Sequence, residues 1–202
     1  RQLDFYRSRQ WLVRGKKLLP IVKPDDASVH FWCDLVLFEL RSDWPLHGTL
    51  HPKGSLLVGN AAQHLRGQGR LLPLFTPTPA RSLAGITATR SHLLLNVLDN
   101  VASRLQERWR CDGKWLSRDV DAPFPGALEA SALHDPLLAD DPMADQYLVR
   151  YTDFLTPDSL LLGRAGSDDR VTLKSQPRFF DAAGMRVAIV GGPGIGKSTL
   201  VR

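Results

Sequence analysis

Residues 185–202 read MRVAIVGGPGIGKSTLVR, and this stretch decides the fold that we expect for the end of the chain. Residues 185–190 form a short apolar run with β-branched members, which is typical of a buried parallel strand. Residues 191–198 then fit the spacing G-x-x-x-x-G-K-[ST] of a phosphate-binding loop. Residues 198–202 follow as the first turn and a half of a helix. The order of strand, loop and helix predicts the start of an incomplete α/β P-loop domain.

This loop carries the binding groups that a nucleotide needs. Its glycines let backbone N–H groups approach phosphate oxygens, and the helix N-terminus adds further donors. Lys197 would reach the β- and γ-phosphates, and the Ser198 hydroxyl would bind Mg²⁺. The predicted cofactor is ATP with Mg²⁺, and GTP stays open because no base-reading residue is in view. The predicted binding residues are Gly191, Gly192, Pro193, Gly194, Ile195, Gly196, Lys197, Ser198 and Thr199.

Residues 187–202 resemble the start of a signal-transducing ATPase with numerous domains (STAND), of the NACHT and NB-ARC type. The similarity rests on Gly-Ile-Gly-Lys, two hydroxyl residues and Leu200, and it covers the last tenth of the chain. It implies a nucleotide-binding, ATP-hydrolysing multidomain switch protein. It also implies that the acidic residues for hydrolysis lie beyond Arg202, in the remainder of a larger chain.

The composition is that of an ordinary soluble globular chain. The 202 residues are 43% hydrophobic and 23% charged, which allows one domain, or one domain and a piece of another. A first residue other than Met suggests an excised or processed piece. No run of about 18 apolar residues occurs, so we expect no membrane span. Cys33 and Cys111 are expected to be reduced core residues of a cytoplasmic protein.

The remaining sequence predicts mixed α and β structure. Residues 2–14 and 90–110 have apolar residues at helical spacing, and the second range is the clearest helix. Residues 29–40 predict one long strand or two neighbouring strands, and short strands are expected at 56–58, 71–75 and 170–174. We therefore expect an α+β domain at residues 1–165 with a possible sensor or effector role, a linker at 166–184 and a truncated P-loop start at 185–202.

An alternative function follows from the net charge of +5. Seven cations within the first 23 residues could bind nucleic acid or a protein partner, which would make the chain a non-enzymatic interaction module. A solvated basic surface explains the same charges. These cations are Arg1, Arg7, Arg9, Arg14, Lys16, Lys17 and Lys23.

Three further groups of side chains could carry chemistry. His47 and His51 have an H-x-x-x-H spacing, although Gly48 argues against the helix that would bring them together around a metal. Asp25 and Glu39 resemble the acidic pair of a PD-(D/E)xK nuclease, with Arg41 in place of the lysine, and this would be a Mg²⁺-dependent site. Asp119 and Asp121 are paired acids that could bind a metal or lie solvated in a loop.

Overall fold

The computed structural model describes residues 1–100, 102–121 and 126–185. Within them the chain forms sixteen β-strands and one α-helix of five residues. The chain divides into two compact units, residues 1–83 and 84–202, and each is described by itself.

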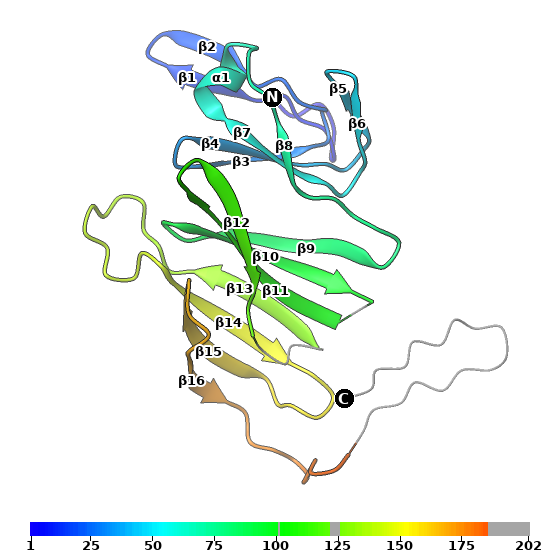
Figure 1. Cartoon of the computed structure of the whole chain (residues 1–202), viewed down its shortest axis with the longest axis vertical. Helices are drawn as coiled ribbons and strands as arrows, with labels where there is room; N and C mark the ends of the chain where they lie inside the picture. The colour runs from blue at the N-terminus through cyan, green and yellow to red at the C-terminus, as the bar shows by residue number, and fades with distance from the viewer. Residues whose placement is uncertain (101, 122–125, 186–202) are drawn as a thin grey trace, which may run out of the picture. The chain divides into compact units, whose positions relative to one another are not determined.

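Unit 1 is built around an antiparallel sheet of four strands in the order β3-β4-β7-β8. A separate hairpin precedes this sheet, a second hairpin follows β4, and a helix lies between β7 and β8 (Figure 1). The sheet strands are β3 (Ser28–Trp32), β4 (Leu35–Glu39), β7 (Leu56–Asn60) and β8 (Leu72–Phe75). The hairpins are β1 (Trp11–Arg14) with β2 (Lys17–Pro20) and β5 (Trp44–Leu46) with β6 (Thr49–His51), and the helix is α1 (Ala61–Leu65).

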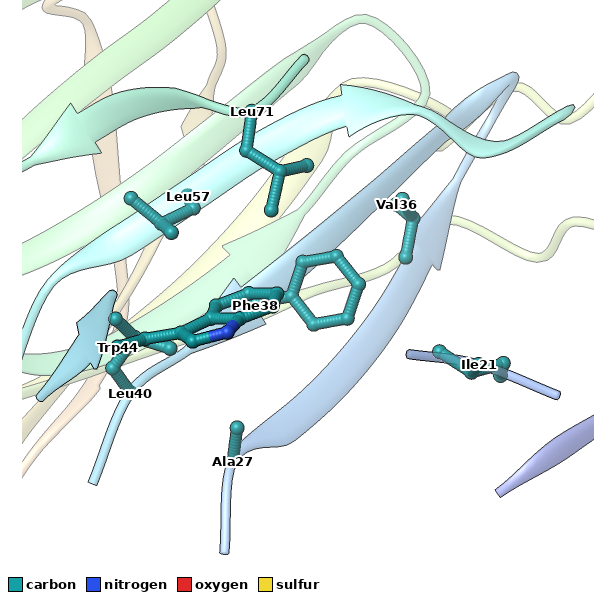
Figure 2. Packing of buried hydrophobic residues seen from close by; sticks show 8 residues of the cluster. All are labelled: Ile21, Ala27, Val36, Phe38, Leu40, Trp44, Leu57 and Leu71. Carbon is teal, nitrogen blue, oxygen red and sulfur yellow. The ribbon is translucent and has the colours of Figure 1, made fainter. Parts of the chain in front are cut away.

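One face of this sheet carries a hydrophobic core. Val36, Phe38 and Leu40 alternate along the chain and point to the same side, as residues two apart do in a strand (Figure 2). Leu57 joins them from β7. The ring of Trp44 meets that of Phe38 edge-on at a centroid distance of 5.6 Å, and this contact anchors the β5–β6 hairpin on the core.

Unit 2 consists of two four-stranded antiparallel sheets in which strands that follow one another in sequence are neighbours in space (Figure 1). The first sheet contains β9 (Arg81–Ala88), β10 (His92–Asp99), β11 (Ala102–Cys111) and β12 (Lys114–Asp119). The second contains β13 (Ala127–Ala132), β14 (Gln146–Thr152), β15 (Ser159–Arg164) and β16 (Arg170–Ser175).

The two sheets of unit 2 share a core. Leu94 and Leu105 of the first sheet pack in one cluster with Tyr147, Val149 and other residues of the second. The Tyr147 side chain is fully buried, and its ring lies so close to Gly163 that a Cβ there would be 2.8 Å from Cζ. A glycine at this position of β15 therefore makes room for the tyrosine.

The predicted α+β fold is wrong, because the described residues are almost entirely strands. The expected helix at residues 90–110 is the β10–β11 hairpin, which turns at Asn100 with φ of 47°. The expected helix at residues 2–14 includes β1, which turns at Gly15 and pairs with β2.

Several short strand predictions are confirmed. Residues 29–40 form the pair β3 and β4, and the ranges 56–58, 71–75 and 170–174 fall on β7, β8 and β16. The predicted P-loop strand and loop, including Lys197 and Ser198, lie outside the described residues from residue 186 onward. The predicted domain bounds at 165 and 184 stay predictions.

Candidate functional site

A buried carboxylate connects the two sheets of unit 2. Glu107 in β11 is fully buried, and its Oε2 accepts a hydrogen bond from Arg118 Nε of β12 at 2.6 Å. Both carboxylate oxygens also accept from the backbone N–H of Gly166, at 3.1 and 3.2 Å. Gly166 lies in the turn between β15 and β16. Glu107 thereby fixes that turn to the first sheet.

The ion pair continues toward the surface. Arg118 Nη1 donates to Asp168 Oδ2 at 2.9 Å, and Asp168 Oδ1 accepts from the backbone N–H of Asp121 at 2.9 Å. Arg170 donates to the backbone carbonyl of Asp121. We call Glu107, Arg118, Asp168 and Arg170 the seam cluster. Asp121 enters it through its backbone.

Charge and burial shift the pKa values in this region. The backbone hydrogen bond from Asp121, followed by the pairing with Arg118, holds the pKa of Asp168 below its usual value. The bond to Glu107 raises the pKa of Arg118. Burial, with a smaller effect of the Glu107 charge, raises the pKa of Tyr147, so this phenol stays neutral. The cluster is arranged to hold sheets together, and its acids are already occupied by cations and N–H donors.

Ser91, His92 and Asp145 form a second group in unit 2. Ser91 Oγ lies 2.7 Å from Asp145 Oδ1 and 2.7 Å from His92 Nδ1. Asp145 Oδ1 also accepts from the Ser91 backbone N–H and from Thr89 Oγ1, each at 2.9 Å. These bonds attach the β9–β10 turn to the residue before β14.

The order of these three groups differs from that of a catalytic triad. In a triad the imidazole lies between the hydroxyl and the carboxylate and takes the hydroxyl proton. Here the hydroxyl lies between the other two groups and donates a hydrogen bond to Asp145. Burial by itself would raise the pKa of Asp145, but the bonds from Ser91 and Thr89 outweigh it and lower that pKa. Ser91 is therefore part of a structural clamp and not an activated nucleophile.

The histidines predicted as a metal pair lie on the β5–β6 hairpin. His47 is in its turn with φ of 48°, and His51 pairs with Trp44 across the strands. Within the described ranges, no three His, Cys, Asp or Glu side chains are grouped so that they could hold a metal ion. The hairpin therefore offers two imidazoles and no third ligand of those types.

The predicted acidic pairs have other partners. Asp25 is ion-paired with Arg9 at 3.4 Å, and Glu39 lies in β4 between Ser28 and Leu56 of the neighbouring strands. Asp119 accepts from Gln106 Nε2 at 2.6 Å. Asp25 and Asp119 therefore each contact a side chain other than the second acid of the predicted pair.

The basic N-terminus is only partly free to bind an anion. Arg7 pairs with Asp4 at 2.7 Å, and Lys23 Nζ donates to the carbonyls of Ser8 and Pro24. Binding of nucleic acid or protein by this segment stays an untested prediction. Cys33 and Cys111 are exposed, which corrects the expectation that both are core residues. Among the described residues, no helix is long and apolar enough to span a membrane.

The strand arrangement has counterparts among solved peptidases. A post-proline cleaving enzyme from Rickettsia typhi aligns with 89% of this chain and 26% of its own, at a TM-score of 0.73 and 21% identity. Prolyl oligopeptidase B from Galerina marginata aligns with 84% of this chain and 22% of its own, at a TM-score of 0.53 and 12% identity. The fold of this chain is thus that of the β-propeller-like domain of prolyl oligopeptidases.

A curated relative agrees with this result. An uncharacterized peptidase, y4nA, of Sinorhizobium fredii is 31% identical over 153 residues, which are 74% of this chain and 20% of that protein. The chain therefore spans about a fifth of the length of this relative. No protein-family model matches the chain.

These similarities overturn the predicted identity and function. The chain is similar to peptidases and not to a P-loop NTPase or STAND switch protein. The predicted ATP or GTP with Mg²⁺ is wrong on the same ground. The similarities also give no support to a basic interaction module or a Mg²⁺-dependent nuclease. The sequence signal that could have indicated the fold is a series of short strands separated by turns, such as Asp112-Gly113.

Proposed function

We propose that this chain is a non-catalytic, β-propeller-like part of a larger serine peptidase that cleaves peptides after proline. The observation that carries the proposal is the alignment of 89% of the chain with a post-proline cleaving enzyme at a TM-score of 0.73. The 31% identity to a peptidase supports it independently, because that comparison uses sequence alone.

The internal contacts of the chain agree with a supporting role. Glu107 and Asp145 are both occupied in connecting strands, and the Ser91 hydroxyl donates to a carboxylate. In this proposal the chain contributes to hydrolysis as a folded support and supplies no reacting group. The nucleophile, its base and the oxyanion donors would come from the rest of the peptidase.

A serine-directed fluorophosphonate probe tests this division. The full-length gene product and the 202-residue chain are each labelled, digested and mapped by mass spectrometry. We expect the full-length protein to be labelled at one serine outside residues 1–202, and the 202-residue chain to remain unlabelled. Labelling of Ser91, or of any other serine within these residues, would place the nucleophile here and contradict the proposal. A folded full-length protein that takes no label would contradict it as well.

A further inference from the structure

Unit 1 contains a groove that the peptidase proposal does not use. It lies between the β5–β6 hairpin and residues 67–73, which lead into β8, and has a volume of about 710 Å³. Small-molecule sites in proteins commonly have about 300–1,000 Å³. Its apolar lining includes Leu46, Leu50, Leu71 and Leu72. The groove is large enough for two or three amino-acid side chains.

The groove lining contains one cation, Arg70, and no acidic residue. Its other titratable residues are His47 and His51. Arg70 is exposed, and in the described part of the chain no carboxylate pairs with its guanidinium. A guanidinium binds a carboxylate through two parallel hydrogen bonds when one is present.

The second observation is the buried state of His51. This residue is 9% exposed, yet its imidazole has no hydrogen-bond partner among the described residues. Neither of its ring nitrogens is fully enclosed, so the imidazole, which lines the groove, can hydrogen-bond to a ligand atom there. Trp44 pairs with His51 across the hairpin and packs on Phe38, so the imidazole is held in place before any ligand arrives.

The opposite wall is shaped by glycines. Gly67 has φ of +72°, and a Cβ on Gly69 would lie 2.8 Å from the backbone nitrogen of His64. These positions let residues 67–70 run close to α1 and place Arg70 beside the groove. One wall is therefore held by the packing of Trp44 on Phe38, and the other by the close approach of Gly69 to α1.

We propose that this groove binds a short peptide with apolar side chains through its free C-terminal carboxylate. Arg70 pairs with the carboxylate, His51 hydrogen-bonds to the ligand, and Leu46, Leu50 and Leu72 contact its side chains. This site is separate from the proposed role of the chain in a peptidase and does not rest on it. A metal ion fits less well, because only two imidazoles are present and Arg70 would repel a cation.

Calorimetric titration of the 202-residue chain with N-acetyl-leucyl-leucine and with the C-terminal amide of the same peptide tests the site. We expect the acid to bind at least about ten-fold more tightly than the amide, because the amide removes the charge-assisted hydrogen bonds. Arg70→Gln should remove this preference. Arg66→Gln, four residues earlier and outside the groove lining, is the matched control and should retain it.

His51→Gln tests the second contact, with exposed His30→Gln as its control. We expect weaker binding of the acid for His51→Gln only, and circular dichroism confirms that each variant is folded. If His51→Gln does not fold, the Arg70→Gln variant still tests the proposal, because Arg70 is exposed and its substitution should leave the fold intact. Equal binding of acid and amide, no binding of either, or the same affinity in the Arg70→Gln and Arg66→Gln variants would overturn the proposal. Tight Zn²⁺ binding that is lost in His51→Gln would overturn it in favour of a metal site.

Discussion

Arg118 Nε donates a hydrogen bond to Oε2 of the fully buried Glu107 over 2.6 Å, and the same carboxylate accepts the N–H of Gly166 in the second sheet of unit 2. One side chain thus satisfies a cation on its own sheet and a turn on the neighbouring one. A buried charge is tolerated only when it is paired and hydrogen-bonded. The pair is therefore one of the contacts, beside the shared hydrophobic core, that hold the two sheets in register.

Glu107→Ala should strongly destabilise the chain. The substitution leaves Arg118 partly buried without its main partner and the N–H of Gly166 without an acceptor, so we expect a loss of about 3–5 kcal/mol in the free energy of unfolding. Urea titration followed by tryptophan fluorescence measures it. Glu129→Ala on β13 is the matched control, because Glu129 is exposed. Similar midpoints for the two variants would show that the seam cluster does not connect the sheets.

Gly163→Ala should destabilise unit 2 through overpacking. A Cβ at this position would lie 2.8 Å from Cζ of Tyr147, which is fully buried and cannot move away at low cost. We expect a loss of about 1–3 kcal/mol. Gly85→Ala in β9 is the control, because a Cβ there meets nothing within 4 Å. Thermal melting compares the two, and an unchanged melting temperature for Gly163→Ala would contradict the packing described for Tyr147.

His64 should make the stability of unit 1 depend on pH. Burial lowers the pKa of its imidazole below the usual 6.5, against a smaller opposite effect of the hydrogen bond to Val22 O at 2.9 Å. The folded state therefore prefers neutral His64, and stability that is present above pH 6.5 is lost as the pH falls toward the lowered value. The slope is at most about 1.4 kcal/mol per pH unit for one proton.

Urea unfolding at pH values from 7.5 to about 5 measures this slope. His64→Gln keeps a donor for Val22 and removes the titration, so its stability should vary less with pH over this range. His47→Gln, at an exposed turn position, should behave like the wild type. An equal slope for wild type and His64→Gln would assign the pH dependence to other groups.

Ser91→Ala in the full-length protein tests whether Ser91 has a structural role or is the catalytic nucleophile. Loss of the hydroxyl removes a bond to Asp145 and should lower the free energy of unfolding by about 1 kcal/mol. We expect kcat/KM for peptide hydrolysis to stay within about two-fold, because nucleophile removal would cost far more. A folded variant without measurable hydrolysis would assign catalysis to Ser91.

The sequence predicts part of this fold. Residues 29–40 are rich in β-branched and aromatic residues, which fit a strand and poorly fit a helix, and they form β3 and β4. The β10 strand is different, because Leu93, Leu94 and Leu95 are all buried and the alternation that marks a half-exposed strand is lost. Apolar residues then also fall at helical spacing, and the left-handed turn at Asn100 is the remaining local sign of a hairpin.

The candidate sites were harder to predict for a related reason. Glu107 meets Arg118 and Gly166, which are 11 and 59 residues away in sequence, so no local pattern marks the cluster. The loop at residues 191–198, by contrast, has a spacing that is a strong local sequence signal. That signal covers only a small part of the chain. The similarity to peptidases extends over 74% of the chain and outweighs it.

Hydrolysis of a matched pair of chromogenic peptides tests the central claim most directly. The peptides differ only in having proline or alanine before the scissile bond, and they are given to the full-length gene product and to the 202-residue chain. We predict that the full-length protein cleaves the proline peptide at least about ten-fold faster than the alanine peptide, and that the 202-residue chain cleaves neither. A folded, full-length protein that hydrolyses neither peptide would contradict the account, as would equal rates on both.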